Sequence, residues 1–225
     1  ETTRKDYSSS NGDGDYITGN IGGIAGLVAG NYTHIEASGN RGVVHTGSDY
    51  TKQTAQAINV GRIAGKIDVN TNDINPSSNR LTYIKTDTKQ AVISGSYNAG
   101  DVEGYANIGG IAGFAYNGSI AESYNIGHIT TTRSNASGET AVNLGGILGD
   151  STEKATGRVV IYDTYNKGDL GAADFKTYGR HFGGIVGRLS GIVEKSYNTG
   201  NIYDGSSVVG GIAGYWYAGE MKNVF

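Results

Sequence analysis

Three oxygen-bearing side chains near the start of the chain could bind a metal ion. Asn11, Asp13 and Asp15 alternate with glycines in the segment Asn-Gly-Asp-Gly-Asp, which is the one-three-five spacing of calcium-binding loops. An EF-hand loop also requires a bidentate carboxylate at its twelfth position, where this chain has Gly22. Calcium is therefore a candidate cofactor that lacks one ligand. The alternative interpretation is a polar turn before the first strand, with no cofactor.

Aromatic residues form a second candidate site, for binding rather than catalysis. Tyr215, Trp216 and Tyr217 follow one another, and Phe114 and Tyr116 echo them earlier in the chain. Such clusters can hold a sugar or a protein partner. On a strand only two of three consecutive side chains share a face. Core packing or capping of the fold is therefore the alternative interpretation.

A set of catalytic side chains is harder to recognise in this sequence. Asp101, Asp169 and Asp204 follow copies of a Tyr-Asn-x-Gly tetrad at similar offsets. Carboxylates on one solvent face form the sites of polysaccharide-active enzymes built on parallel β-helices. Only the first two directly follow the glycine of the tetrad, which favours a role as corner residues. No Ser, His and Asp set stands out by spacing, so we expect no enzymatic activity from this segment.

The elements that must position these residues come from two repeated motifs, a Gly-Gly-Ile-x-Gly pentad and the Tyr-Asn-x-Gly tetrad. Self-similarity at this period is typical of units that bury a face only by stacking on their neighbours. The pentads begin at Gly22, Gly109, Gly145, Gly183 and Gly210, with the variant Gly61-Arg62-Ile63-Ala64-Gly65, and the tetrads begin at Tyr97, Tyr124, Tyr165 and Tyr197, with a weaker copy at Gly39.

Composition favours strands over helices. The chain has 38 glycines and a single proline in 225 residues, and glycine in a helix interior costs about 1 kcal/mol. The shortest repeat, residues 183–209, contains three short alternating stretches. We therefore predict an all-β fold, a repeat solenoid of parallel β-helix type with about three short strands per coil, and right-handed crossovers.

Stacking of equivalent positions predicts several ladders along such a fold. The pentad isoleucines should form one interior column: Ile24, Ile111, Ile147, Ile185 and Ile212. The tetrad tyrosines should stack, and the tetrad asparagines should form an amide ladder and adopt the left-handed conformation at corners. Ile108 and Ile111 are three residues apart, which strict alternation would place on opposite faces. A bend at the glycine pair would reconcile them.

The boundaries of the array follow from where the motifs stop. Residues 1–16 carry no repeat residues and are expected to be an N-terminal tail or linker. The repeat region is expected to span residues 17–225, with polar insertions at 46–59 and 67–92 that leave the regular path. Phe225 occupies the position of a tetrad tyrosine, which suggests that the segment ends within a repeat of a longer protein.

Net charge and cysteine content exclude several classes of binding partner and of metal site. The formal net charge is -3, which gives no electrostatic case for nucleic acid or an anionic membrane. No apolar run is long enough to span a bilayer. The absence of cysteine excludes disulfides and thiolate metal sites.

The two motifs closely resemble the GLUG repeat of bacterial surface and secreted proteins, over about residues 17–225. Ser96-Tyr97-Asn98-Ala99-Gly100 and Ser196-Tyr197-Asn198-Thr199-Gly200 carry the likeness best. The region looks especially like the repeats upstream of the catalytic domain in zinc metallopeptidases of the IgA1 protease family. Departures at Gly39 and Arg62 predict distorted coils near the N-terminus.

The resemblance implies a location outside the cell, secreted or attached to the cell wall. It implies a noncatalytic spacer or substrate-engaging segment, with immunoglobulin A1 or another host glycoprotein as partner and the two insertions as contact loops. Zinc would belong to a catalytic domain elsewhere in the protein, because this segment has no His-Glu-x-x-His motif. Two alternatives remain: an adhesin segment that binds a host glycan or matrix protein, and, third, a β-helix enzyme active on polysaccharides.

Overall fold

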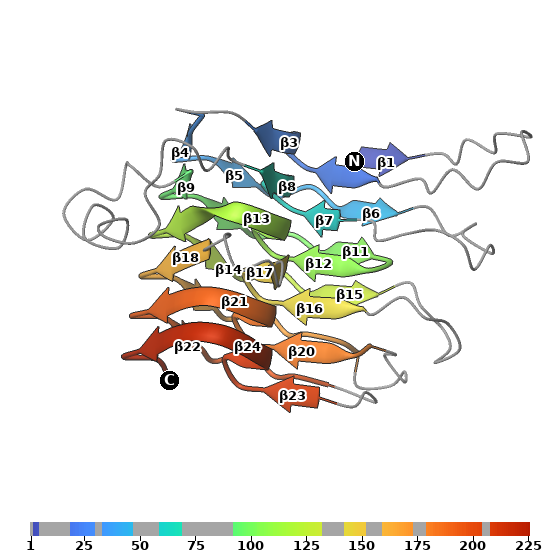
Figure 1. Ribbon diagram of the computed structural model, residues 1–225. Coiled ribbons are helices and arrows are strands. Elements are labelled where there is room, and N and C mark those ends of the chain that lie inside the picture. The colour runs from blue at the N-terminus through green and yellow to red at the C-terminus, as the bar shows by residue number, and fades with distance from the viewer. Residues whose placement is uncertain are drawn as a thin grey trace, which may run out of the picture.

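The part of the chain that the structure describes is all-β, and its strands pair in parallel. The computed structural model describes residues 2–4, 19–29, 33–46, 59–68, 92–131, 142–151, 159–172, 179–203 and 208–225. Within these ranges the regular elements are strands, without a helix. The strands lie roughly perpendicular to a common axis, with the two chain ends toward opposite ends of the stack (Figure 1).

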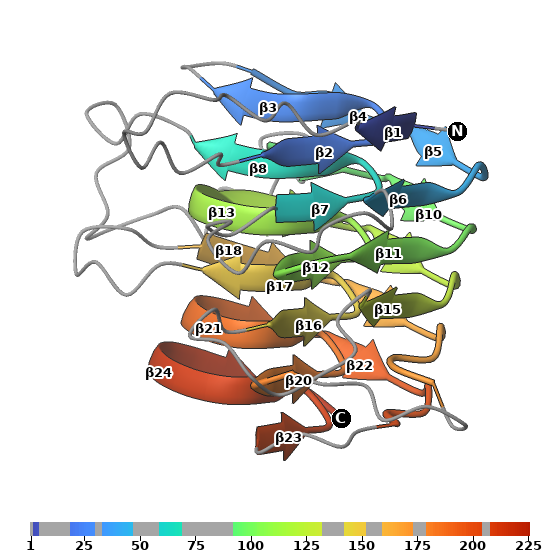
Figure 2. The same ribbon diagram turned by 90° about the vertical axis from the view of Figure 1, so that its right-hand side faces the viewer.

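Four parallel sheets run along this axis (Figure 2). Sheet A contains, in spatial order, β1 (Thr2–Arg4), β6 (Val44–Thr46), β11 (Val102–Gly104) and β15 (Ile129–Thr131). Sheet B contains β2 (Asn20–Gly22), β7 (Asn59–Gly61), β12 (Asn107–Gly109), β16 (Asn143–Gly145), β20 (His181–Gly183) and β23 (Val208–Gly210).

Sheets C and D hold the strands that follow the pentad bend. Along the path of sheet C lie β3 (Ala25–Ala29), β8 (Ala64–Asp68), β13 (Ala112–Ala121), β18 (Val159–Tyr162), β21 (Val186–Glu194) and β17 (Leu148–Ser151), with β24 (Ala213–Lys222) on β21 and β4 (Ile35–Glu36) and β9 (Ile93–Ser94) leading to β13. Sheet D contains β5 (Gly39–Asn40), β10 (Tyr97–Asn98), β14 (Tyr124–Asn125), β19 (Tyr165–Asn166) and β22 (Tyr197–Asn198).

Equivalent positions of successive repeats pair with each other. Asn107 pairs with Asn59 on one side and with Asn143 on the other, and Tyr124 pairs with Tyr97 and Tyr165 in the same way. We call the strands of one repeat a layer. The prediction of all-β structure with parallel stacking of equivalent residues is confirmed, whereas the described strands fall into four sheets rather than three sets of strands.

The glycine pair of each pentad bends the chain between sheets B and C. Ile108 precedes the bend and Ile111 follows it, and both are fully buried in two separate hydrophobic clusters. A Cβ atom on Gly146 would lie 2.1 Å from the carbonyl oxygen of Gly184 and 2.4 Å from Cγ of Asn166. In this inner layer the position therefore requires a residue without a side chain, whereas Arg62 occupies the equivalent position of the variant pentad. The bend reconciles the three-residue isoleucine spacing as expected.

The predicted isoleucine column forms the interior of the middle layers but not of the first. Ile111, Ile147 and Ile185 are fully buried, and Ile212 packs against the same cluster with partial burial. Ile24 is 46% exposed, so its assignment to the interior was wrong. It lies in the first pentad layer, whose strands β2 and β3 have a paired neighbour on one side only among the described residues.

Left-handed backbone occurs at a different position from the one predicted. The tetrad asparagines lie in strands, and the left-handed residue comes two positions before the tetrad. These corner residues are Ala37, Gly95, Glu122, Asp163, Lys195 and Asn223, with φ between 46° and 56°. The prediction failed because the Asn side chain acts through hydrogen bonds, while the sharp corner falls on an exposed position that tolerates several residue types.

The two departures from the repeat leave the strand register unchanged. Gly39 pairs with Tyr97, and Gly61, which precedes Arg62, pairs with Gly109. The side chain of Arg62 is fully buried, and its Nη1 donates to the carbonyl oxygen of Asp101 at 2.5 Å. The expectation of distorted coils is therefore wrong for the backbone pairing at these two positions.

The boundaries predicted from the motifs are only partly within the described residues. β1, from the segment expected to be an N-terminal tail, pairs in parallel with β6. The ends of the insertions 46–59 and 67–92 belong to strands β6, β7 and β8 or lie beside β9. The remaining residues of both insertions lie outside the described ranges.

Candidate functional site

The tetrad asparagines form the predicted amide ladder. Asn125 Nδ2 donates to Oδ1 of Asn166 at 2.6 Å, and Asn166 Nδ2 donates to Oδ1 of Asn198 at 2.7 Å. Each Oδ1 also accepts from the amide of its own tetrad glycine, as Asn125 does from Gly127 at 3.2 Å. One side chain thus fixes both the local turn and the contact between layers.

The tetrad tyrosines stack face to face beside this ladder, also as predicted. Ring centroids of Tyr124 and Tyr165 lie 4.9 Å apart with planes 3° apart. The stack begins at Tyr97 and continues through Tyr197 to Phe225, whose ring lies 5.3 Å from that of Tyr197. Phe225 therefore takes the tyrosine position, as its sequence alignment indicated.

A second polar ladder runs along sheet B, and the sequence analysis missed it. It joins Asn20, Asn59, Asn107, Asn143 and His181 through side-chain hydrogen bonds of 2.7 to 2.9 Å. The signal was present in the sequence as an asparagine two residues before the pentad in four of its copies. Because Oδ1 of Asn143 only accepts, Nδ1 of His181 carries the proton.

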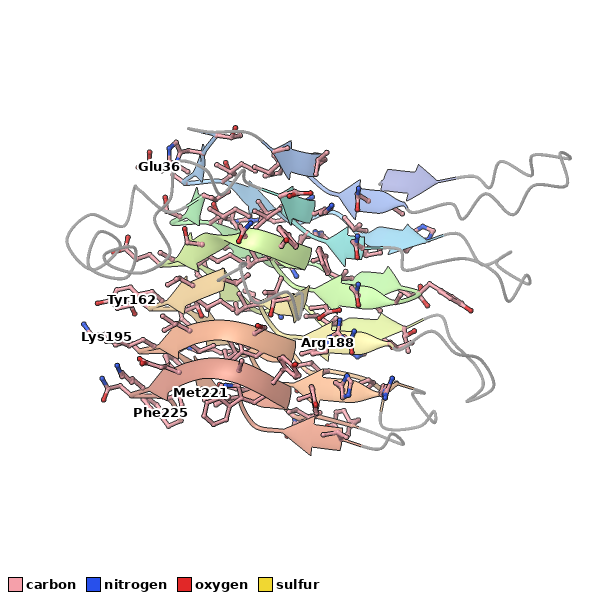
Figure 3. The ribbon with its side chains drawn as sticks, in the orientation of Figure 1. Glu36, Tyr162, Arg188, Lys195, Met221 and Phe225 are labelled. Carbon is pink, nitrogen blue, oxygen red and sulfur yellow. The ribbon has the colours of Figure 1, made fainter. Side chains whose placement is uncertain are left out.

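This ladder ends in a polar cluster where sheets B and C meet. Asn143 Nδ2 also donates to Oδ2 of Asp150 at 3.2 Å. Arg188 donates to Asp150 from Nε at 2.7 Å and from Nη2 at 2.8 Å. The Asp150 side chain is almost fully buried, so this two-point pairing compensates a charge that water does not reach. Figure 3 labels Arg188 beside the bend.

His181 is held in its neutral form within the cluster. Its side chain is only 6% exposed, and burial lowers its pKa from 6.5 to about 4, with the nearby cations of Arg180 and Arg188 adding to the effect. The ring of Tyr215 stacks on it at 4.9 Å. A neutral imidazole with Nδ1 engaged in the ladder stabilises the bend and is a poor acid at neutral pH.

The aromatic candidates fall into two separate groups. Tyr215 and Tyr217 lie on one face with centroids 6.4 Å apart, and they are 39% and 53% exposed. Trp216 pairs with the buried Leu189, so it extends an interior column even though it is 53% exposed in the last layer.

Phe114 and Tyr116 occupy the same positions three layers earlier. In the strand register Phe114 pairs with Asp150, Asp150 with Arg188, and Arg188 with Tyr215. The ring of Phe114 lies 5.9 Å from Nζ of Lys66. Tyr116 and Tyr217 are both the extra residue where the strand register shifts by one. The structure therefore does not bring the two aromatic groups together into one surface.

Two of the three candidate carboxylates, Asp101 and Asp169, accept hydrogen bonds from the backbone of the next layer. Asp101 Oδ1 accepts from the amide of His128 at 3.2 Å, and Asp169 Oδ1 accepts from the amide of Asn201 at 2.8 Å. Both contacts link one layer to the next. Asp204 lies outside the described residues.

Metal binding has no support within the described part of the chain, which contains no group of three or more His, Asp or Glu side chains able to hold an ion. The calcium candidates Asn11, Asp13 and Asp15 lie outside the described ranges. The described residues also include no helix of the length and apolarity needed to cross a membrane.

Comparisons with known proteins found no match to this chain among protein-family models, curated proteins or solved structures.

Proposed function

We propose that this chain is a right-handed parallel β-helix, a β-solenoid in which each repeat forms one coil, and that it acts as a noncatalytic spacer. The observation that carries the proposal is the pair of side-chain ladders that cross successive layers without a break from Asn98 to Asn198 and from Asn20 to His181. Such ladders hold neighbouring layers at fixed spacing, which is what a rigid spacer requires.

The resemblance of the motifs to GLUG repeats supports placing this spacer in a large secreted or wall-attached bacterial protein. A zinc metallopeptidase of the IgA1 protease type is the parent that the likeness favours. In that protein the segment would hold a distant catalytic domain at a set distance and engage its glycoprotein substrate. Zinc and the catalytic residues would then belong to that other domain.

Deletion of one repeat tests the spacer directly. Removing residues 124–164 joins Ser123 to Tyr165, which restores a Ser-Tyr-Asn sequence at the junction. The shortened chain is expected to fold with strand-type circular dichroism, and small-angle scattering should show an axis shorter by about 5 Å, one strand spacing. Cooperative loss of all structure would contradict a stack of nearest-neighbour layers.

Substrate engagement needs its own experiment. The chain is passed over immobilised immunoglobulin A1 in a surface plasmon resonance measurement, together with variants in which residues 47–58 or 69–91 are replaced by short Gly-Ser linkers. Binding that weakens on loop replacement supports engagement through the insertions. Absence of binding by the intact chain would remove substrate engagement and leave the spacer role as it stands.

A second candidate function is glycan binding by an adhesin segment, favoured by the exposed Tyr215 and Tyr217 pair beside the Arg188 cluster. Aromatic faces next to charged hydrogen-bonding groups suit sugar rings. A glycan array with the intact chain and Tyr217→Ala tests it. Tyr116→Ala is the matched control, because Tyr116 occupies the same bulge position in an inner layer.

A further inference from the structure

The second pentad has an arginine where the other pentads have a glycine. We call β2 to β6 the first pentad layer and β7 to β11 the second, and Arg62 lies between β7 and β8. The place it takes is narrow in the inner layers. A Cβ atom on Gly110, Gly146 or Gly184 would lie 2.4 to 2.6 Å from Cγ of the tetrad asparagine of the same layer. A side chain at this position therefore competes for space with that asparagine, which is Asn98 in the second layer.

The guanidinium of Arg62 reaches the place where the tetrads of the first and second layers meet. Nη1 donates to the carbonyl oxygen of Asp101 at 2.5 Å. A Cβ atom on Gly100 would lie 2.2 Å from Nη2 of Arg62 and 2.6 Å from the carbonyl oxygen of Gly42 in the first layer. The cation is thus held against the contact between the two layers.

Most of the hydrogen-bond donors of this cation are unpaired. The side chain of Arg62 is fully buried, and Nε and Nη2 have no hydrogen-bond partner among the described residues. Burial also lowers the pKa of the guanidinium, although the charge of Asp101 opposes this effect. A buried charge with unsatisfied donors destabilises the contact that buries it.

The tetrad asparagine ladder stops at the same contact. Asn98 Nδ2 donates to Oδ1 of Asn125 in the third layer at 2.5 Å. Asn40, in the first layer, uses its Oδ1 for its own turn, at 2.9 Å from the amide of Gly42. The described residues include no side-chain hydrogen bond between Asn40 and Asn98. The first layer is therefore not joined to the second by this ladder.

The aromatic stack stops there too, whereas the ladder of sheet B continues. Gly39 pairs with Tyr97, so the first layer supplies no ring at the tetrad position. In sheet B, Asn59 Nδ2 donates to Oδ1 of Asn20 at 2.8 Å. The first and second layers thus share one of the three side-chain ladders, in addition to the backbone pairing of their strands.

We propose that the contact between the first and second pentad layers is a weak junction, at which the stack opens reversibly while the layers beyond it stay closed. Opening lets water solvate Nε and Nη2 of Arg62. The parallel pairing of β7 with β2 and of β8 with β3 closes the junction again. Its cause is the buried charge of Arg62, which lies between two described layers, and not the position of the first layer in the stack.

The junction goes beyond the proposed spacer function, since it gives a rigid stack one point at which it yields. The two ideas fail separately. Without a weak junction the stack would be uniformly rigid and would still serve as a spacer. An unfolded repeat-deletion variant would overturn the spacer and leave the junction to its own measurement.

Native-state hydrogen exchange, followed by nuclear magnetic resonance on the intact chain, measures the opening of each contact. The amides of Ala25 and Ala99 report on the junction, because each donates across it, at 2.9 and 3.1 Å. The amides of Ala112 and Lys167 donate in the same way between the third and fourth layers, at 3.0 and 2.8 Å. The first pair should exchange at least about tenfold faster than the second.

Substitution of Arg62 shows whether its charge is the cause. Arg62→Met keeps an unbranched side chain and removes the charge, so exchange of Ala25 and Ala99 should slow by about tenfold. Exchange of the inner amides should not change. Arg62→Lys keeps a buried cation and should not slow exchange at the junction. Arg180→Met is the matched control, because it removes an exposed arginine from an inner layer, and it should leave the junction unchanged.

A second variant keeps the test decisive if Arg62→Met does not fold, which circular dichroism shows. Arg62→Gly restores the glycine of the other pentads and should slow exchange of the same junction amides. The proposal is overturned if neither variant slows exchange at the junction, or if Arg62→Lys slows it as much as Arg62→Met. It is also overturned if the slowing is equal at the inner amides, because the effect would then be global.

Discussion

Two regions of the molecule each contain a ladder of asparagines. One is the tetrad edge, by which we mean the tetrad strands of sheet D, and the other is the pentad bend, where the ladder of sheet B lies. The two ladders differ in the hydrogen bonds that each asparagine side chain makes. At the tetrad edge, Asn125 bonds to the layers on both sides and also to the amide of Gly127 in its own turn. At the pentad bend, the side chain of Asn107 bonds to Asn59 and Asn143 in the neighbouring layers. The first ladder shapes each layer, while the second mainly joins layers.

The difference explains why one ladder is uniform and the other is not. A tetrad asparagine is tied to a turn, so the same residue returns at positions 98, 125, 166 and 198. A pentad asparagine only needs a hydrogen-bond partner in each neighbouring layer. Its position is therefore occupied by His181 in the fifth layer and by Val208 in the sixth. Residue types vary more at the bend, which includes the Asp150 and Arg188 ion pair, whereas the residues beside the asparagines of the tetrad edge are mainly aromatic.

The largest effect is expected at the bend. Arg188→Met leaves the buried carboxylate of Asp150 without its two-point partner, which should lower the free energy of unfolding by about 3 to 5 kcal/mol. The double variant Asp150→Asn with Arg188→Met removes the charge as well and should recover part of the loss. Urea denaturation followed by circular dichroism measures both. Equal losses in the two variants would show that the charge of Asp150 is not what the arginine compensates.

The two ladders can be compared residue for residue. Asn125→Ala removes bonds to both neighbouring layers and to its own turn, so it should lower the free energy of unfolding by about 3 kcal/mol. Asn107→Ala removes interlayer bonds only and should lower it by about 2 kcal/mol. The same denaturation experiment compares them. A larger loss at Asn107 would contradict the view that the tetrad asparagine has the additional local role.

Acid should weaken the bend through His181. Its pKa is about 4 in the folded chain and 6.5 as the reference value, so between these values the unfolded chain binds a proton that the folded chain does not. The free energy of unfolding should therefore fall with decreasing pH, by about 2 kcal/mol between pH 7.5 and pH 5 from this residue. His181→Asn, which continues the ladder with the residue found in four other layers, should flatten this part of the pH profile. An unchanged profile would exclude His181 as its source.

Sequence reasoning reached the tetrad edge because its residues repeat in type as well as in position. The tyrosine stack and the Asn98 to Asn198 ladder were predicted from spacing alone, and Phe225 was placed correctly in the stack. The left-handed corner was assigned to the wrong residue, since its side chains vary from Ala37 to Lys195 and share only a backbone conformation.

The bend was harder to predict because its chemistry depends on pairs that meet only after stacking. Asp150 and Arg188 are 38 residues apart, and the pair occurs in one place only among the described residues. No repeated motif in the sequence therefore indicates it. The exposure of Ile24 and Trp216 follows from their layers being at the ends of the stack, which residue type does not encode. A periodic sequence thus predicts the contacts that recur in every layer. Contacts made by a single pair of residues, and the exposure of side chains in the first and last layers, are visible only in the structure.

The smallest effect is expected from the aromatic stack at the tetrad edge. Tyr165→Leu removes two ring contacts, to Tyr124 and Tyr197, and should lower the free energy of unfolding by about 1 to 2 kcal/mol. Phe225→Leu removes one contact at a position that is 79% exposed and should have an effect below about 0.5 kcal/mol. If the two losses were equal in urea denaturation, the stack would contribute only as exposed surface, and the asparagine ladder alone would hold this edge of the layers together.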